Sequence, residues 1–262
     1  MKLRVNHQTI YRYEQMVKRS VQYLKMSPQT LANQKVLSWQ LSVPGKTITQ
    51  SDGFGNVWTT LYLDQPHREL FLLAQGEIEI DDQVDKIRDD RHPPELFLHS
   101  TRMTHCDDAM RDFSGQHLKA KSHSDLIEFA QALAEKMPYT PGSTHVATTA
   151  SEAFQLGSGV CQDHTHVFLA CVREHDIVAR YVSGYLYSPV LSHMASHAWA
   201  EVLLDGYWYC FDVSNQLFTP SRHIQTAIGR DYLDAAPVRG VRQGGGEESL
   251  SALVQVSVMS EC

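Results

Sequence analysis

Residues 157–163, with the sequence Gly-Ser-Gly-Val-Cys-Gln-Asp, decide how the second half of this chain is expected to fold. A glycine-rich turn leads directly into a predicted helix over residues 160–175, which places Cys161 in the first helical turn. The unpaired N–H groups and the positive end of the helix dipole stabilise a thiolate there. They can also bind the oxyanion that forms when a thiolate attacks a carbonyl carbon. The alternative is a small buried helix residue, which is the usual state of a cysteine.

A base and a residue that orients it are predicted downstream of Cys161. His197 and Asp212 lie on two consecutive predicted strands, and the dipeptide Asp205-Gly206 between them is a strong hairpin signal. The two side chains can therefore lie side by side across the hairpin. The carboxylate could then hold one imidazole nitrogen and leave the other for the thiol. Taken singly, each of these two residues is more often structural or solvated.

The pattern around these residues predicts helices that are followed by strands. Ser124 can cap a helix whose apolar stripe has helical spacing, and Pro138 ends it. The expected helices cover residues 124–137, 149–155 and 160–175, and the expected strands cover residues 179–187, 196–204 and 207–213.

The first part of the chain reads as strand after strand. Short β-rich runs separated by turn residues indicate an antiparallel, sandwich-like domain over residues 1–88. Pro93 and Pro94 mark a linker, and we expect residues 89–123 to form a linker or connecting segment. Residues 124–262 then form the core that contains Cys161, and a last strand over residues 250–259 is expected to close it.

Composition favours a soluble globular protein. Of its 262 residues 42% are hydrophobic, which is enough for one large domain or two modest ones. The formal net charge of −7 argues against a nucleic-acid or anionic-membrane surface, because such a surface needs a basic patch. No apolar run is long enough to cross a bilayer, and the first residues lack the apolar segment of a secretory signal. We therefore expect a cytoplasmic protein without a nucleic-acid or membrane partner.

The cysteines and histidines predict neither a disulfide framework nor a metal. The five cysteines are irregularly spaced and indicate free thiols in a reducing compartment. They are Cys106, Cys161, Cys171, Cys210 and Cys262. Of the 14 histidines, His164, His166 and His193 lie close in sequence to Cys161 or His197, but no CxxC or HExxH spacing occurs. We expect these three to line a cleft or face solvent, and we expect no cofactor.

Four motifs together resemble a known family. They are GVCQD (159–163), RYVSGY (180–185), HAW (197–199) and FD (211–212). In combination they are similar to the core of bacterial transglutaminase-like proteins. The resemblance implies an α+β, papain-like fold with helices packed on an antiparallel sheet. It also implies a Cys–His–Asp triad, in which Cys161 is the nucleophile, His197 the base and Asp212 the orienting residue.

The resemblance extends to both ends of the chain. Residues 52–56 and 66–67 look like parts of the β-rich N-terminal domain of this bacterial family. Residues 229–232 and 237–240 are similar to its C-terminal stretch. The resemblance therefore covers nearly the whole chain.

Four further residues are candidates for the oxyanion hole or the substrate pocket. Gln155 precedes the nucleophile at the spacing where papain-type proteases place an oxyanion-hole glutamine, although a solvated helix-end glutamine is the alternative. Gln162 flanks the nucleophile. Trp199 and Tyr185 could wall an acyl pocket, and core packing remains open for both.

The predicted reaction is acyl transfer at an amide or peptide bond through a Cys161 thioester. If water accepts the acyl group, the enzyme is a peptidase or amidase, and if an amine accepts it, the enzyme is a protein-glutamine transglutaminase. We favour hydrolysis with a peptide or protein amide as the substrate. The other alternative is a non-catalytic peptide-binding module, which has no chemical need for three intact triad residues.

Overall fold

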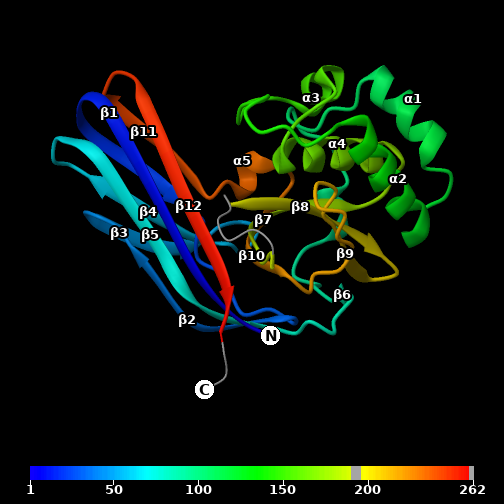
Figure 1. Cartoon of the computed structure of the whole chain (residues 1–262), viewed down its shortest axis with the longest axis horizontal. Coiled ribbons are helices and arrows are strands. Elements are labelled where there is room, and N and C mark those ends of the chain that lie inside the picture. The colour runs from blue at the N-terminus through cyan, green and yellow to red at the C-terminus, as the bar shows by residue number, and fades with distance from the viewer. Residues whose placement is uncertain (190–195, 260–262) are drawn as a thin grey trace.

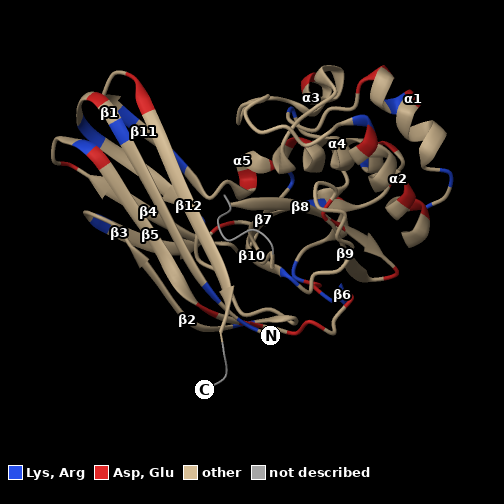
Figure 2. Cartoon of the chain, in the orientation of Figure 1, with Lys and Arg blue, Asp and Glu red and all other residues tan. Residues whose placement is uncertain are grey.

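The computed structural model describes residues 1–189 and 196–259. Two antiparallel sheets dominate it, one built largely from the first part of the chain and one covered by helices (Figure 1). Acidic and basic residues are interspersed over the ends of the first sheet and over the helices (Figure 2). Among the described residues no helix is both long and apolar enough to cross a membrane.

The first sheet is organised around one long strand, β1 (Lys2–Leu24). Its five-strand path is β2-β5-β1-β4-β3, and β11 and β12 also pair with β1. These strands are β2 (Gln34–Ser42), β3 (Lys46–Ser51), β4 (Val57–Leu63), β5 (His67–Ile80), β11 (Val238–Gly244) and β12 (Glu248–Val258). The start of β1 alternates buried residues such as Leu3 and Val5 with outward-facing ones, so one face of the sheet is apolar.

The last strand does not close the core that contains Cys161, as the sequence had led us to expect. Strand β12 pairs antiparallel with β1, with Leu3 opposite Val258, and Val254 is buried beside Leu3 and Val5. A β-rich pattern predicts that a strand forms, but it does not specify its partner. The C-terminal strand therefore completes the N-terminal sheet.

The connecting segment 89–123 is packed against the rest of the chain. It contains a 3₁₀ helix, η1 (Pro94–Phe97), and helix α1 (Asp108–His117). Phe97 and Met110 are fully buried, and the Asp89 carboxylate lies 2.8 Å from the Arg180 guanidinium of the core. Pro93 and Pro94 begin the 3₁₀ helix, because proline is compatible with a first helical turn.

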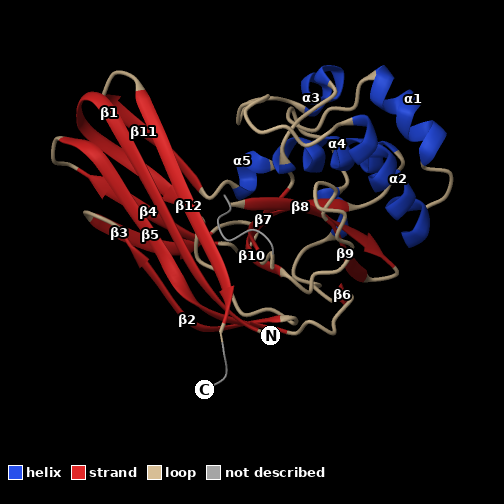
Figure 3. Ribbon diagram, in the orientation of Figure 1, coloured by secondary structure: helices blue, strands red, loops and turns tan. Residues whose placement is uncertain are grey.

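The second sheet has the order β10-β7-β8-β9-β6, and helices cover one of its faces (Figure 3). Its strands are β6 (Lys86–Ile87), β7 (Ala179–Leu186), β8 (His197–Leu204), β9 (Tyr207–Phe211) and β10 (His223–Gly229). The remaining helices are α2 (His123–Lys136), α3 (Ala150–Leu156), α4 (Cys161–Glu174) and α5 (Tyr232–Ala235). Helix α4 packs on β7 and β8, and Val167, Phe168 and Cys171 are buried in this contact.

The predicted hairpin between β8 and β9 is confirmed. Asp205 and Gly206 both have positive φ angles, 50° and 80°, as the tight turn of a two-residue hairpin requires. The expected helices agree with the observed ones to within one or two residues at each end. Mixed helices and curled antiparallel sheets confirm the predicted α+β class with a β-rich N-terminal part.

The two sheets contact each other through a shared apolar cluster. Tyr185 and Ile224 of the second sheet pack against Leu3, Val5 and Ile78 of the first. A polar contact supports it, because the Asn56 side chain donates to the Ile228 carbonyl and accepts from the Ile228 N–H, each at 2.8 Å. The N-terminal sheet thus supports the sheet that carries His197.

Candidate active site

Cys161 is the first residue of helix α4 and is partly exposed. The Asp163 carboxylate accepts from the Val160 N–H at 2.8 Å and from the Thr144 hydroxyl at 2.6 Å, which fixes the start of the helix. Gly159 must lack a side chain, since an added Cβ would lie 2.6 Å from the Asp163 Cβ. The predicted placement of Cys161 in the first turn is therefore confirmed by the helix bounds.

We expect Gly159→Ala to destabilise the start of α4. The new methyl group would displace the buried Asp163 side chain and weaken its two hydrogen bonds, at a cost of about 1–3 kcal/mol in unfolding free energy. Chemical denaturation measures this loss. Gly53→Ala is the comparison, because an added Cβ there meets no atom within 4 Å and Gly53, like Gly159, does not have a positive φ. Equal stability of wild type and Gly159→Ala would contradict the packing argument.

His197 and Asp212 meet across the β8–β9 hairpin. His197 begins β8, Asp212 directly follows β9, and the imidazole Nε2 lies 2.7 Å from the carboxylate Oδ2. Ser214 and Asn215 in the next turn donate to Asp212 as well, from the Ser214 hydroxyl at 3.0 Å and from the Asn215 side chain at 3.0 and 3.2 Å. These donors hold a fully buried carboxylate in one orientation.

The buried His197 imidazole and Asp212 carboxylate each stabilise the charged form of the other. Burial alone lowers the pKa of His197, but the charge of Asp212 and hydrogen bonds to Asp212 and Cys161 outweigh it and raise the pKa to about 10. Burial raises the pKa of Asp212, but the charge and hydrogen bond of His197 and the hydrogen bond from His223 hold it well below its usual range. The His197 imidazole is therefore cationic at neutral pH.

This raised pKa predicts a pH-dependent contribution to stability. The His197 imidazolium stabilises the fold fully below the unfolded pKa of 6.5, and the contribution is lost as the pH rises towards about 10. The difference in unfolding free energy between wild type and His197→Gln should therefore shrink between pH 6.5 and pH 10. Urea denaturation across this range measures it. A difference that grows with pH would show that the cation is not stabilised.

Two residues of this cluster were not among the predicted site residues. His223, the first residue of β10, places its Nε2 3.1 Å from the same Asp212 Oδ2. The Asn215 side chain lies 3.3 Å from His197 Nε2. Turn chemistry offered a weak signal for Asn215, since asparagine favours such positions. His223 carried none, because strand order alone brings β10 to the site.

The structure places the four pocket candidates in different surroundings. The Trp199 ring stacks beside His197, with ring centroids 6.1 Å apart. The Gln162 amide, next to the nucleophile, donates to the Val146 carbonyl. Gln155 is exposed on α3 and donates to Asp107 at the start of α1. The Tyr185 hydroxyl lies 3.1 Å from His7 Nδ1, in the contact between the sheets.

The chain also offers one potential metal-ligating group among its described residues. His197, Asp212 and His223 present three ligand atoms within 4.8 Å of one another. These atoms are joined directly, at 2.7 and 3.1 Å, so protons on the imidazole nitrogens occupy the space between them. The arrangement fits a hydrogen-bonded cluster. His164 and His166 are buried, and His193 lies outside the described residues.

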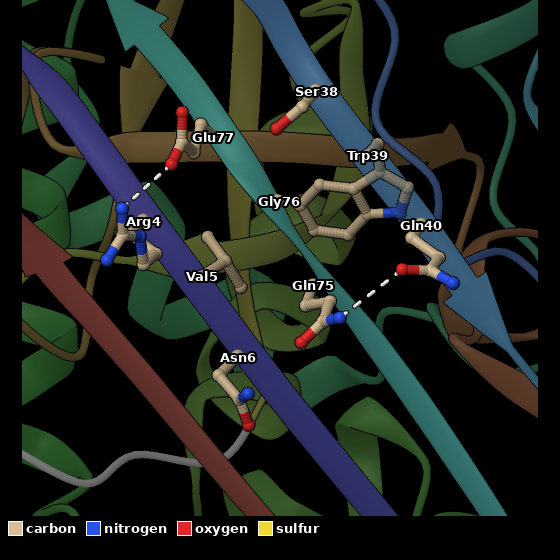
Figure 4. A pocket seen from close by; sticks show the side chains of 9 residues that line it. All are labelled: Arg4, Val5, Asn6, Ser38, Trp39, Gln40, Gln75, Gly76 and Glu77. Atoms are coloured by element: carbon tan, nitrogen blue, oxygen red, sulfur yellow. Dashed lines mark hydrogen bonds and ion pairs between the residues drawn. The ribbon is translucent and has the colours of Figure 1, made fainter.

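A hollow of about 310 Å³ lies apart from this cluster, on the N-terminal sheet (Figure 4). The Trp39 ring lies against Gly76, where an added Cβ would come within 2.6 Å of it. Two pairs of polar side chains around the hollow are hydrogen-bonded, Arg4 with Glu77 at 2.9 Å and Gln75 with Gln40 at 3.4 Å. The hollow offers no group comparable to the Cys161 thiol.

Comparison with known proteins identifies both parts of the chain. Residues 3–79 match the family model of the bacterial transglutaminase-like N-terminal region, and residues 115–213 match that of the transglutaminase-like superfamily. An uncharacterised protein of Mycobacterium tuberculosis is 27% identical, with 97% of this chain and 91% of that protein covered. A second, from Mycobacterium leprae, is 27% identical, with 98% of each covered.

A solved structure supports the fold over the full length. A candidate cysteine protease from Cytophaga hutchinsonii gives a TM-score of 0.82 at 20% identity, with 100% of this chain and 92% of that chain covered. At this level of identity the similarity shows the fold. Together with the two matching family models, it leads to one conclusion: the chain belongs to the transglutaminase-like superfamily and carries the bacterial N-terminal region of that superfamily ahead of its core.

Proposed function

We propose that the protein is a cysteine-dependent acyl transferase that acts on amide or peptide bonds, with hydrolysis as its main reaction. The observation that carries this proposal is the placement of His197: its Nε2 is bonded to the buried Asp212 carboxylate at 2.7 Å, and Cys161 is close enough to contribute to the raised pKa of the imidazole. This is the arrangement in which an imidazolium supports a thiolate. Membership of the transglutaminase-like superfamily supports cysteine-based catalysis in general.

The proposed reaction has two steps. The Cys161 thiolate attacks the carbonyl carbon, His197 donates its proton to the leaving amine as the C–N bond breaks, and a thioester remains. His197 then removes a proton from a water molecule, whose oxygen attacks the thioester and releases the acid and the thiolate. N–H groups at the start of α4 are available to bind the oxyanion of each step. Asp212 orients His197 throughout and is not consumed.

The acceptor of the acyl group distinguishes two candidate functions. The triad forms the same thioester whether water or an amine resolves it. We favour water, because it far exceeds any amine in concentration. Transglutamination of a protein glutamine is the second candidate, and it is as compatible with membership of the transglutaminase-like superfamily as hydrolysis is. We expect the protein to act in the cytoplasm on peptide or protein substrates.

An exposed apolar rim beside Cys161 supports a peptide substrate. Tyr139 and Val146 are 54% and 62% exposed. Both belong to the segment that packs against the start of α4. The Thr140 N–H donates to the Gly159 carbonyl at 2.8 Å and fixes this segment against the glycine turn. Burial and the charges of Cys161 and Asp212 raise the pKa of Tyr139, so its hydroxyl lies within electrostatic range of the site. We propose that this rim binds an apolar side chain next to the attacked carbonyl.

Tyr139→Ala should weaken the turnover of peptides with an apolar residue beside the scissile amide. Loss of one aromatic contact predicts a decrease in kcat/KM of about tenfold, mainly through a higher KM. Steady-state kinetics on matched peptides with leucine or serine at that position measures it. The Cys161 alkylation rate with iodoacetamide, which is too small to need the rim, should remain unchanged. An equal loss for both peptides would contradict an apolar subsite.

The direct test of the proposed function is intact-mass analysis with mixed peptide and glutamine-amide libraries. We expect an acyl adduct on the wild type that is absent from Cys161→Ala. Product analysis with and without an added primary amine then separates the two acceptors: acids indicate hydrolysis, and amine conjugates indicate transamidation. A wild type that forms neither adduct nor product would favour a peptide-binding module.

A further inference from the structure

A second histidine shares the carboxylate that orients His197. Asp212 Oδ2 accepts from His197 Nε2 at 2.7 Å and from His223 Nε2 at 3.1 Å. The two imidazole rings are nearly parallel, at 29°, with centroids 6.1 Å apart. Their side chains are 5% and 1% exposed, and that of Asp212 is 0% exposed, so no bulk water replaces either contact.

The sheet is built to let His223 reach this position. His223 begins β10, which is separated from the His197 strand β8 by β7. Gly184 of β7 lies opposite His197, and an added Cβ there would come within 1.9 Å of the Ile224 carbonyl oxygen and 3.1 Å of Trp199. The glycine therefore permits the close packing in which the Trp199 ring lies 4.7 Å from the His223 ring.

The other contacts of His223 fix its orientation. Nδ1 lies 3.9 Å from the Cys210 sulfur, within the range of a weak thiol hydrogen bond. Nε2 faces an ionised carboxylate, which only accepts hydrogen bonds, so Nε2 carries a hydrogen. Among the described residues, the ionisable groups that face His223 are thus Asp212 and Cys210 from the β9 side and His197 from β8.

We propose that His223 is a positioning residue of the active site: it fixes Asp212 Oδ2 so that this oxygen holds His197 against Cys161. Asp212 has other donors in Ser214 and Asn215, but both come from the turn that directly follows it. Apart from His197 itself, His223 is the donor among the described residues that ties the carboxylate to another strand. Loss of its bond lets Oδ2 move relative to His197 Nε2 and weakens the imidazolium–thiolate pair. The proposal rests on the proposed function, since it assigns a role within that triad.

The test compares variants that differ in the hydrogen bond to Asp212. His223→Phe keeps a ring and removes the donor, whereas His223→Gln keeps an N–H near the position of Nε2. The readout is the rate of Cys161 alkylation by iodoacetamide between pH 5 and pH 9, located by peptide mass analysis. We expect His223→Phe to lower the rate at pH 6 about tenfold, as loss of a hydrogen bond to a charged group implies, and His223→Gln to restore most of it. Amide turnover should show the same order in kcat, with KM unchanged.

A matched control separates this role from simple packing. His166 is fully buried, its Nε2 accepts from the Tyr232 N–H, and no side-chain hydrogen bond or ring contact among the described residues joins it to the triad. His166→Phe should reduce thermal stability and leave the pH profile of alkylation as in the wild type. If His223→Phe does not fold, His223→Asn, whose shorter amide does not reach Asp212, replaces it in the comparison with His223→Gln.

The outcomes distinguish the two proposals. If Cys161 of the wild type reacts with iodoacetamide at pH 6 no faster than Cys106 does, the proposed function itself is wrong. An activated Cys161 in the wild type, with the same profile in folded His223→Phe or His223→Asn, overturns the role of His223 alone. If the pH profile of alkylation is shifted in His223→Phe or His223→Asn and His223→Gln does not restore it, the role of His223 is also overturned. The hydrogen bond would then not be the cause of the shift.

Discussion

Cys161→Ala is expected to abolish acyl-adduct formation and to lower amide turnover by a factor of about 10⁵ or more, because no other group can form the thioester. Cys161 is the first residue of α4 and is partly exposed. Truncating its side chain therefore removes the nucleophile without opening a cavity in the core. The unfolding temperature should therefore stay within a few degrees of the wild type. Intact mass and steady-state kinetics on the same preparation measure both effects.

A second thiol variant serves as the control for this experiment. Cys106 is buried just before α1, away from His197, and Cys106→Ala should retain the adduct and the turnover of the wild type. Residual turnover in Cys161→Ala above one part in a thousand would contradict covalent catalysis by this residue. Adduct on a thiol other than Cys161 would do the same.

Asp212→Ala is expected to lower kcat by about 10³–10⁴ and still permit slow adduct formation. The carboxylate is fully buried and accepts from His197 at 2.7 Å, so its removal leaves the imidazole without its orienting partner and lowers the pKa of His197 from its raised value. The substitution also leaves Ser214, Asn215 and His223 without their acceptor. A fall in stability of about 3 kcal/mol or more should accompany it.

The pattern of adducts distinguishes orientation from proton transfer. His197→Ala should give no adduct within the time in which Asp212→Ala gives a partial one, measured by intact mass over several hours. Asp231→Ala is the matched control, since Asp231 is a buried aspartate that caps α5 and interacts with the charge of Arg173, and no hydrogen bond among the described residues joins it to the triad. It should reduce stability without changing the rate of adduct formation. Equal loss in Asp212→Ala and His197→Ala would show that Asp212 does more than orient the base.

Local signals explain why much of this cluster could be predicted from the sequence. The turn at Asp205-Gly206 fixes the β8–β9 pairing by its own backbone preferences, and this pairing brings His197 and Asp212 together. Helix α4 could be predicted for the same reason, because a glycine turn precedes its apolar stripe. Neither feature depends on distant parts of the chain.

The features that sequence reasoning missed all depend on distant contacts. His223 reaches Asp212 only because β10 lies beside β7, which no local pattern specifies. The same holds for Tyr185, whose hydroxyl meets His7 from the first strand of the chain. Segment 89–123 looked like a linker because its two prolines are conspicuous, whereas its buried residues, such as Phe97, are isolated in sequence.

The pairing of β1 with β12 has a consequence for how the chain folds during synthesis. Strand β1 leaves the ribosome before the core that contains Cys161, and β12 leaves it after that core. The edge of β1 that pairs with β12, from Leu3 to Tyr13, therefore stays unpaired while the intervening chain is made. Contacts of such large sequence separation form slowly, and an open strand edge is prone to aggregation. Newly made chains of this protein should thus depend on early folding of the core to bring β12 back to β1.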